Sequence, residues 1–291
     1  MAEPRKLTPA EEARLAQVRE QFKQKQAISN SLNSIKYRIG VYSGKGGVGK
    51  TTTVINLAAG LTMKGKKILV IDLDPQGNAS TGFGIDNIDR NTHIYHTLIN
   101  QITIKEAIKS SIVPKLFLIP ADTDLAAAEV ELRNRKNREF ILDMLLRPIT
   151  DSYDYIIIDC PPSLGLLTVN AFSASHSVLV PLQCEFYALE GLAQLLRSIE
   201  LVKKNLNPSL TIQGIVLTMF DSRNNLSEMV VNDVRKHFGK QVYQTIIPRN
   251  VRISEAPSFG QPVLMYDINC SGSKAYTSLA AELLQQENVN L

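Results

Sequence analysis

The hydrophobic residues of this chain gather into short continuous runs separated by longer, more polar stretches. A continuous apolar run, in place of strict alternation, is typical of a strand buried on both faces of a parallel sheet. The pattern predicts seven strands, at residues 39–42, 67–72, 115–120, 155–159, 177–182, 211–219 and 242–247.

Segments with helical periodicity separate these strands. They predict helices at residues 52–61, 125–146, 187–205 and 273–286, and shorter helical patterns at 96–99 and 104–108. Strands that alternate with helices favour an α/β fold. We expect a doubly wound, mostly parallel sheet flanked by helices, with ligands bound at the carboxyl ends of its strands.

A glycine-rich stretch joins the first predicted strand to the first predicted helix. Residues 44–51 fit G-x-x-x-x-G-K-[ST], a turn whose backbone N–H groups face one anion. The glycines let the main chain approach phosphate oxygens, and the following helix N-terminus adds to the anion site. The expected nucleotide-binding residues of this P-loop are Gly44, Lys45, Gly46, Gly47, Val48, Gly49, Lys50, Thr51 and Thr52.

Two roles follow from that motif, and carboxylates at later strand ends add a third. Lys50 is expected to meet the β- and γ-phosphates of ATP, and Thr51 to offer its hydroxyl to Mg²⁺. The strand at 67–72 delivers Asp72 and Asp74 to the carboxyl end of the sheet, and the strand at 155–159 ends in Asp159. Apolar residues followed by Asp159 match Walker B logic, in which a rigid strand end holds a carboxylate near Mg²⁺.

Composition describes an ordinary globular protein. The chain has 291 residues, of which 44% are hydrophobic, and no apolar run approaches the 18 residues of a membrane span. The first residues lead into no signal-peptide core, so we expect a cytoplasmic protein. Three cysteines, Cys160, Cys184 and Cys270, form no C-x-x-C and are expected to be free, buried thiols.

The net charge of +4 lies at the beginning of the chain. Residues 1–38 carry eight basic and four acidic side chains, which leaves 24 of each in the rest. Thr8 to Glu11 is a helix-start signature, and the helix it predicts has a narrow apolar stripe. That stripe can pack on the domain or on a partner. We expect a basic helical extension at 1–36 and a P-loop ATPase domain at 37–291, on which any nucleic-acid surface must be a local patch.

Five stretches carry a resemblance to a known family. Residues 45–52 read K-G-G-x-G-K-T-T, residues 72–80 and 159–165 follow buried strands, and residues 184–191 and 248–258 complete the set. Together they resemble the deviant Walker A ATPases of the ParA/MinD/Soj class, and Soj-type ParA in particular, over about residues 45–285.

That resemblance implies roles for particular residues. Lys45 is expected to reach across a homodimer to the partner's ATP, and Asp74 to position the attacking water while Lys45 and Lys50 stabilise the developing charge. Metal is expected at Thr51, Asp74 and Asp159, with Asp72 nearby through water. Pro248, Arg249 and Asn250 are expected beside the nucleotide base, and Arg223 and Arg252 on nonspecific double-stranded DNA.

The resemblance also implies a biological role. ATP would join two subunits into a dimer that binds DNA, and slow hydrolysis, stimulated by a ParB-like partner, would release it. The expected outcome is segregation of chromosome or plasmid DNA by a nucleoid-associated protein. The source and the identity of the partner are left open.

Two alternatives remain. Residues up to about 49 look more like the beginning of Mrp-type ATPases, which carry iron–sulfur clusters, so the chain is either a natural variant or a join of two relatives. Such a carrier needs a C-x-x-C, which is missing here. A MinD-like membrane-site regulator ends in a basic amphipathic helix, whereas residues 282–291 contain acidic side chains and no Lys or Arg, which disfavours membrane binding.

Overall fold

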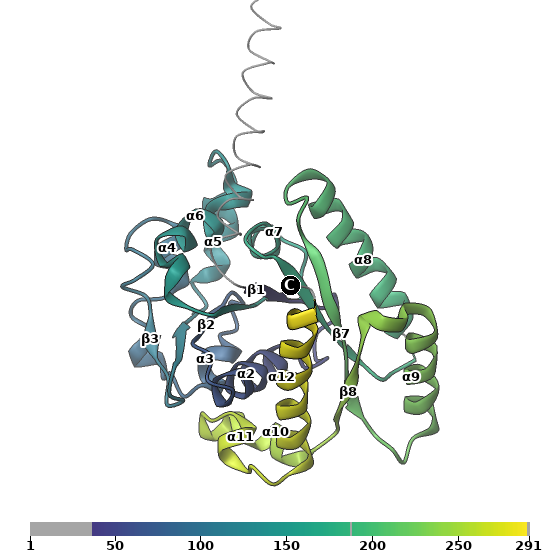
Figure 1. The fold of residues 1–291 in the computed structure, drawn as a ribbon. Helices are drawn as coiled ribbons and strands as arrows, with labels where there is room; N and C mark the ends of the chain where they lie inside the picture. The colour runs from purple at the N-terminus through teal and green to yellow at the C-terminus, as the bar shows by residue number, and fades with distance from the viewer. Residues whose placement is uncertain (1–36, 187, 290–291) are drawn as a thin grey trace, which may run out of the picture.

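The computed structural model describes residues 37–186 and 188–289 (Figure 1). The predicted basic extension at 1–36, with its helix and apolar stripe, lies outside the described residues. The division into 1–36 and 37–291 therefore stays a prediction.

The described residues form one eight-stranded sheet with the order β3-β4-β2-β5-β1-β6-β7-β8. Within it only the short edge strand β3 runs antiparallel to its neighbour. The seven predicted strands are all present, and β3 is an addition. Their bounds are β1 Tyr37–Val41, β2 Ile68–Asp72, β3 Lys109–Ser110, β4 Leu116–Ile119, β5 Tyr155–Asp159, β6 Ser177–Gln183, β7 Thr211–Phe220 and β8 Val242–Pro248.

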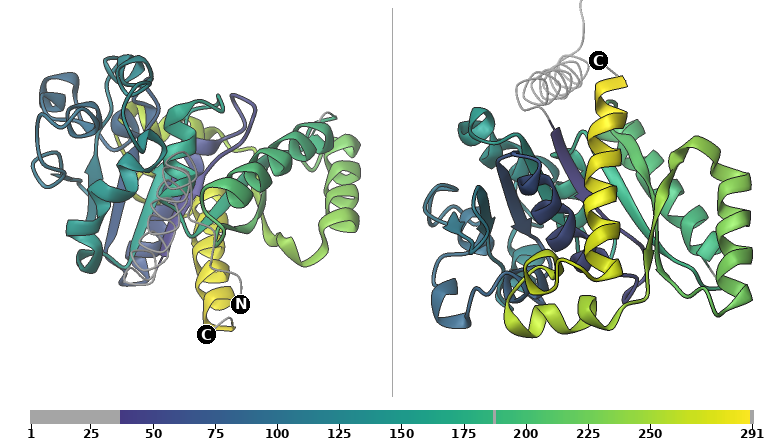
Figure 2. Two further views of the ribbon diagram at one scale, coloured as in Figure 1. Left: turned by 90° about the horizontal axis from the view of Figure 1, so that it is seen from above. Right: turned by 60° about the horizontal axis from the view of Figure 1, so that its bottom comes forward.

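Helices cover both faces of the sheet, as the doubly wound prediction requires. Figure 2 shows the long α12 lying across one face, where it packs on α2 and β8. The helices are α2 Lys50–Met63, α3 Asn78–Gly82, α4 Ile94–Leu98, α5 Leu125–Glu131, α6 Ile141–Leu146, α7 Leu166–Ser173, α8 Ala188–Asn205, α9 Asn225–Phe238, α10 Val251–Glu255, α11 Val263–Tyr266 and α12 Ser271–Val289. Short 3₁₀ turns are η1 Asn87–Arg90, η2 Arg138–Phe140, η3 Arg147–Ser152, η4 Gly239–Gln241 and η5 Ala256–Phe259.

Successive residues of the central strands enter different cores. In β2, Leu69 and Ile71 join the core under α4 to α9, whereas Ile68 and Val70 join the core under α2 and α12. All four are fully buried. This explains the continuous apolar runs, because alternate side chains point to opposite faces and both faces are covered.

The single helix predicted at 125–146 is wrong. The chain forms α5, then turns through residues 132–137, and resumes as η2 and α6. Residues 133–139 contain no apolar side chain to hold a buried face, and Asn137 adopts a left-handed backbone with φ of 58°. The pattern at 104–108 likewise gives only turns. Helix α9 was not predicted, although Asn224 caps it by accepting from the Leu226 amide.

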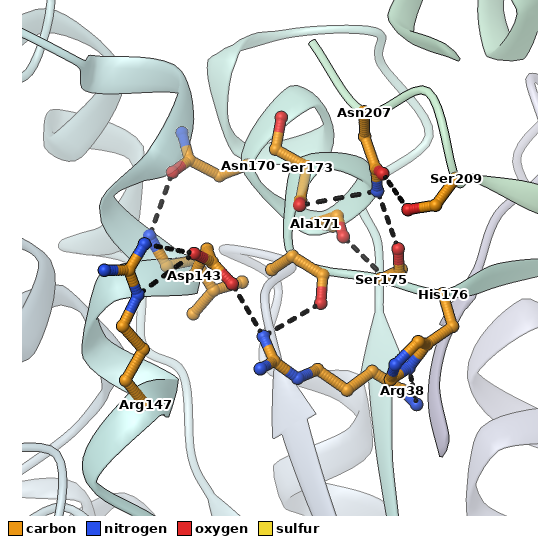
Figure 3. A network of polar contacts seen from close by, with 12 residues as sticks. Arg38, Asp143, Arg147, Asn170, Ala171, Ser173, Ser175, His176, Asn207 and Ser209 are labelled. Atoms are coloured by element: carbon orange, nitrogen blue, oxygen red, sulfur yellow. Dashed lines mark hydrogen bonds and ion pairs between the residues drawn. The ribbon is translucent and has the colours of Figure 1, made fainter. Parts of the chain in front are cut away.

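Arg38 was counted with the basic beginning of the chain, but it is a fully buried residue of β1. Its Nη1 donates to Asp143 Oδ1 on α6 at 2.8 Å and to the Ala174 carbonyl at 3.2 Å (Figure 3). Asp143 Oδ2 also accepts from Arg147 Nη2 at 3.0 Å. The His176 ring accepts from the Arg38 amide. These contacts, called the Arg38 network below, join β1 to α6 and to the end of α7.

A second polar contact lies at the amino-terminal edge of the central strands. The Tyr155 hydroxyl, at the start of β5, donates to Glu287 Oε2 of α12. The Tyr155 ring stacks on Tyr37 with centroids 5.2 Å apart. Burial raises the pKa of Glu287 to about 7, so this carboxyl holds a proton up to near-neutral pH.

Two further expectations concern cysteines and membranes. The three cysteines are free, and Cys160 and Cys184 are buried as predicted. Cys270 is only half-buried, because it lies in the turn before α12, where its Sγ accepts from the Ser273 amide. Among the described residues, no helix combines the length and apolarity needed to cross a bilayer.

Candidate functional site

The P-loop links the end of β1 to the start of α2. Gly47 and Gly49 adopt left-handed backbones, with φ of 76° and 86°, which favour glycine. Gly49 is the N-cap of α2 and has no side chain to satisfy the first-turn N–H groups, so these donors remain available to an anion. Gly44 and Gly46 are outside the left-handed region, and a Cβ added there meets nothing within 4 Å. Backbone conformation therefore favours glycine at Gly47 and Gly49, but not at these two.

Lys50 lies largely buried at the start of α2. Its Nζ donates to the Lys45 carbonyl at 3.1 Å, across the P-loop. Burial lowers the pKa of Lys50, whereas the carboxylates of Asp159 and Asp74 raise it. A desolvated ammonium in this position is a strong partner for phosphate oxygens.

The side chain of Lys45 contacts a different partner from that of Lys50. Its Nζ lies 3.0 Å from Glu185 Oε2 of the same chain, and both side chains are largely exposed. Gly44, Lys45 and Val48 line an apolar cleft between the P-loop and α8, whereas Lys50 lines a different one. The structure thus divides the predicted P-loop set between two clefts.

The acidic strand ends meet beside the P-loop. Asp72 and Asp159 are paired in register on β2 and β5, and Val41, the last residue of β1, is paired with Asp159 on the other side. Asp72 accepts from the Ser80 amide and hydroxyl, at 2.8 and 2.7 Å. Burial nevertheless raises the pKa of Asp72 to about 6.

Asp159 is fully buried, and neither of its carboxylate oxygens has a hydrogen-bond partner within the described part of the chain. Burial, with the charges of Asp72 and Asp74, raises the pKa of Asp159 well above its ordinary value; the nearby Thr51 hydroxyl and Lys50 ammonium act in the opposite direction. An unpaired carboxylate buried between like charges fits a cation, and its neighbour Thr51 supplies the hard oxygen donor that Mg²⁺ prefers.

Asp74 lines the cleft that also contains Lys50, called the P-loop cleft below. Its Oδ1 accepts from the Gln76 amide at 3.0 Å, and its carbonyl from the Gly77 amide at 2.9 Å. The cleft is lined by Gly46, Gly47, Gly49, Lys50, Thr51 and Thr52 together with Asp74. Within the described residues, no three His, Cys, Asp or Glu side chains are grouped to hold a metal by themselves. Mg²⁺ commonly uses one or two carboxylates plus substrate phosphates, so the donors present fit that ion in the company of a nucleotide.

The residues expected beside the base form a third pocket. Pro248, Arg249 and Asn250 line it with Tyr276, and the pocket shares Gly49, Thr52 and Met219 with the P-loop cleft. Both polar atoms of the Asn250 side chain already have partners. Its Oδ1 accepts from the backbone N–H of Arg252, and its Nδ2 donates to Ser271 Oγ, both at 2.8 Å.

The two predicted DNA-binding arginines follow neighbouring strands. Arg223 follows β7 and is 86% exposed, and its guanidinium makes two bonds of 2.9 and 2.8 Å to the Asp221 carboxylate. Arg252, in α10 after β8, lies 3.0 Å from Glu255. The Arg249 amide donates to the Phe220 carbonyl, which joins the two loops. The cations are thus exposed, but each is paired with a carboxylate.

Comparison with known proteins identifies the family. A family model described as an AAA domain matches residues 36–212. The chain is 55% identical over 243 residues to the chromosome partitioning protein ParA of Myxococcus xanthus, covering 84% of this chain and 86% of that one. It is 51% identical over 245 residues to the sporulation initiation inhibitor protein Soj of Bacillus subtilis, covering 84% and 97%. The chain belongs to the ParA/Soj family of P-loop ATPases.

A solved structure of another protein has the same fold as this ParA/Soj chain. Cobyrinic acid a,c-diamide synthase from Mycobacterium smegmatis, with bound ATP analog and magnesium, superimposes with a TM-score of 0.78 at 35% identity, covering 88% of this chain and 98% of that one. The predicted P-loop fold and family are confirmed.

Sequence reasoning about this ParA/Soj chain missed two residues at the site. Ser80 binds Asp72 and also accepts, through Oγ, from the Ala121 amide at 3.0 Å, which ties the Asp72 strand end to β4. Tyr276 of α12 lines the third pocket and lies 3.4 Å from Thr53 Oγ1. Ser80 stands within the stretch 72–80 that carried the resemblance, whereas only the fold brings Tyr276 to the site.

Proposed function

We propose that this protein is a DNA-partition ATPase, which converts ATP and water to ADP and phosphate and thereby controls when it is bound to DNA. The observation that carries the proposal is the 55% identity to the chromosome partitioning protein ParA along 84% of the chain. The geometry supports the chemistry, since Lys50, Thr51 and Asp74 line one cleft and the buried Asp159 carboxylate lies close enough to raise the pKa of Lys50.

In the proposed reaction the P-loop amides and Lys50 hold the β- and γ-phosphates, and Asp74 orients the water that attacks the γ-phosphorus. The hydrogen bond from the Gln76 amide fixes one Asp74 oxygen for that task. Thr51, Asp74 and Asp159 would hold Mg²⁺, with Asp72 near it through water, and the ion would neutralise phosphate charge. Pro248, Arg249 and Asn250 would surround the base, with the main chain of this segment as its polar contact, because the Asn250 side chain is engaged.

The proposed active state is a homodimer with ATP between the subunits. Lys45 would then leave Glu185 and reach the partner's nucleotide. The Lys45–Glu185 pair is exposed, and exposed pairs contribute at most about 1 kcal/mol, so opening it costs little.

DNA binding is assigned to Arg223 and Arg252 of both subunits. Phosphates would replace Asp221 and Glu255 as their counter-charges, which gives a small, nonspecific and salt-sensitive patch on double-stranded DNA. Stimulation of hydrolysis by a ParB-like protein would dissolve the dimer. We propose a cytoplasmic, nucleoid-associated protein that serves chromosome or plasmid segregation; the names of its relatives favour this role over the Mrp-type and MinD-like alternatives.

The deciding experiment measures binding to unrelated duplex DNA with ATP, with ADP and without nucleotide, across a salt series. Wild type should bind only with ATP, and binding should weaken as salt rises. Arg252→Ala should weaken it about tenfold or more in the dimer, which loses two phosphate contacts.

Arg138→Ala is the matched control, because Arg138 is also paired with a neighbouring glutamate at 2.9 Å but lies on η2. It should bind DNA as wild type does. Binding that ignores both the nucleotide and Arg252 would point to the basic residues at the beginning of the chain and would remove the support for the partition proposal.

A further inference from the structure

Arg90, at the end of η1, is a buried cation that the reaction described above leaves without a role. It is 6% exposed. None of the ion pairs among the described residues includes it. Its partners are neutral oxygens: the Ile85 carbonyl at 3.1 and 2.9 Å, the Ala121 carbonyl at 3.3 Å and Thr81 Oγ1 at 2.8 Å. A cation kept from water is costly when all its hydrogen-bond acceptors are neutral and the nearby Asp122 carboxylate acts on it only through its charge, so its placement calls for an explanation.

The hydrogen bonds of Arg90 lead to the water-positioning carboxylate. Thr81 Oγ1 accepts from Arg90 Nη2 and donates to the Gly77 carbonyl at 3.1 Å. The Gly77 amide in turn donates to the Asp74 carbonyl at 2.9 Å. Three hydrogen bonds therefore connect the Arg90 guanidinium to the main chain of Asp74.

The guanidinium also fits closely against this turn. Gly77 has a left-handed φ of 61°, and a Cβ added to it would lie 2.5 Å from Arg90 Nη1 and 3.0 Å from the Ala121 carbonyl oxygen. The turn from Asp74 to Gly77 is thus held between Arg90 and the end of β4. A turn held in this way cannot easily shift its carboxylate by the ångström that would spoil in-line attack.

We infer that Arg90 is a positioning residue for ATP hydrolysis, which acts through Thr81 and Gly77 to hold Asp74 in place over the P-loop cleft. The inference rests on the proposed function and names a further determinant of the same site. Arg90 touches no reacting atom; its fixed fork of donors matches three separate acceptors, which a lysine ammonium at the same place cannot reproduce.

The test compares Thr81→Val with wild type, because this change keeps the shape of the side chain and removes the hydroxyl between Arg90 and Gly77. ATP affinity, measured by titration with a fluorescent ATP analogue, should stay within about twofold. The turnover number should fall about tenfold, because the loss concerns orientation. Arg90→Lys should show the same split between turnover and affinity.

Thr277→Val is the matched control. Thr277 Oγ1 also donates to the carbonyl four residues before it, on Ser273 at 2.9 Å, but in α12. It should hydrolyse ATP as wild type does, which separates the lost relay from the loss of any helical threonine hydroxyl.

Asp74→Asn distinguishes failure of this inference from failure of the proposed function. If Asp74→Asn keeps only a slow residual turnover and Thr81→Val also loses turnover, a double variant should be no slower than Asp74→Asn alone, because both changes act on one carboxylate. Wild-type turnover in Thr81→Val would overturn the role of Arg90 while the proposed site stands. Wild-type turnover in Asp74→Asn would overturn both.

Discussion

The amino-terminal and carboxyl-terminal ends of the parallel strands, called the two edges below, differ in how buried charged groups are compensated. At the amino-terminal edge, Arg38 Nη1 lies 2.8 Å from Asp143 Oδ1, and Glu287 accepts a hydrogen bond from the Tyr155 hydroxyl. At the carboxyl-terminal edge, Asp72 and Asp159 lie side by side, and Asp159 has no hydrogen-bond partner within the described residues. Strand β5 belongs to both edges, with Tyr155 at one end and Asp159 at the other. The Arg38 and Glu287 contacts therefore support structure, whereas the Asp159 carboxylate is left for a ligand.

The largest effect that sharpens this comparison is expected at Asp159. Asp159→Asn keeps the size of the side chain and removes the charge, so ATP turnover should fall at least about a hundredfold. The nucleotide-free protein should melt at a higher temperature, because burial and the charges of Asp72 and Asp74 disfavour a carboxylate at this position more than Thr51 and Lys50 favour it. Phosphate release and thermal unfolding measure the two effects; a variant that loses activity and stability together would mean that Asp159 is compensated after all.

The opposite result is expected for the Arg38 network. Asp143→Asn removes the carboxylate charge that the buried Arg38 guanidinium meets at 2.8 Å and should lower the free energy of unfolding by about 3 kcal/mol, measured in urea. Asp221→Asn is the matched control, because it breaks an Arg–Asp pair at the surface, with Arg223. It should leave the urea midpoint unchanged. Equal losses in the two variants would contradict the difference drawn between internal and surface charge pairs.

The pH dependence of stability tests Glu287. Its pKa is about 7 in the folded chain against an ordinary value of 4.5, so the folded state holds the proton more tightly. The stabilisation is complete below pH 4.5 and is lost as pH rises through 7. Relative to Glu287→Gln, which mimics the protonated acid, wild type should therefore lose urea stability between pH 5 and 8. Parallel curves for the two proteins would rule out this titration.

The smallest effect is expected at Glu185. Glu185→Gln releases Lys45 from its exposed ion pair, and nucleotide-dependent dimerisation should tighten by up to about fivefold, the equivalent of about 1 kcal/mol. Sedimentation velocity with a non-hydrolysable ATP analogue measures it. Weaker dimerisation would show that Glu185 contributes to the dimer directly.

Much of the carboxyl-terminal edge could be predicted from sequence. Glycine spacing, the apolar runs and the aspartates that end them are local signals. They placed Asp72 and Asp159 at strand ends and Lys50 next to the start of the first helix, and the structure brings the three together. The roles of these residues in hydrolysis stay predictions, as do those of Arg223 and Arg252. The structure also adds what local pattern cannot give, namely that Lys45 faces Glu185, 140 residues away.

The amino-terminal edge was hardly predictable. Arg38 looks like one more basic residue until the fold supplies Asp143, which is 105 residues away. The same holds for Tyr155 and Glu287, 132 residues apart. The prediction of one continuous helix at 125–146 failed for a different reason. Helical propensity in a charged stretch cannot outweigh the absence of an apolar face that packs on the core.

The cap of α10 makes base and DNA recognition neighbours along the chain. Asn250 lines the third pocket, and its side chain fixes the amide of Arg252. Under the proposed function, a nucleotide base that settles against residues 248–250 is one helical turn from a guanidinium meant for phosphate. Occupancy of the base pocket is therefore coupled to the position of Arg252 across two residues, through the side chain of Asn250.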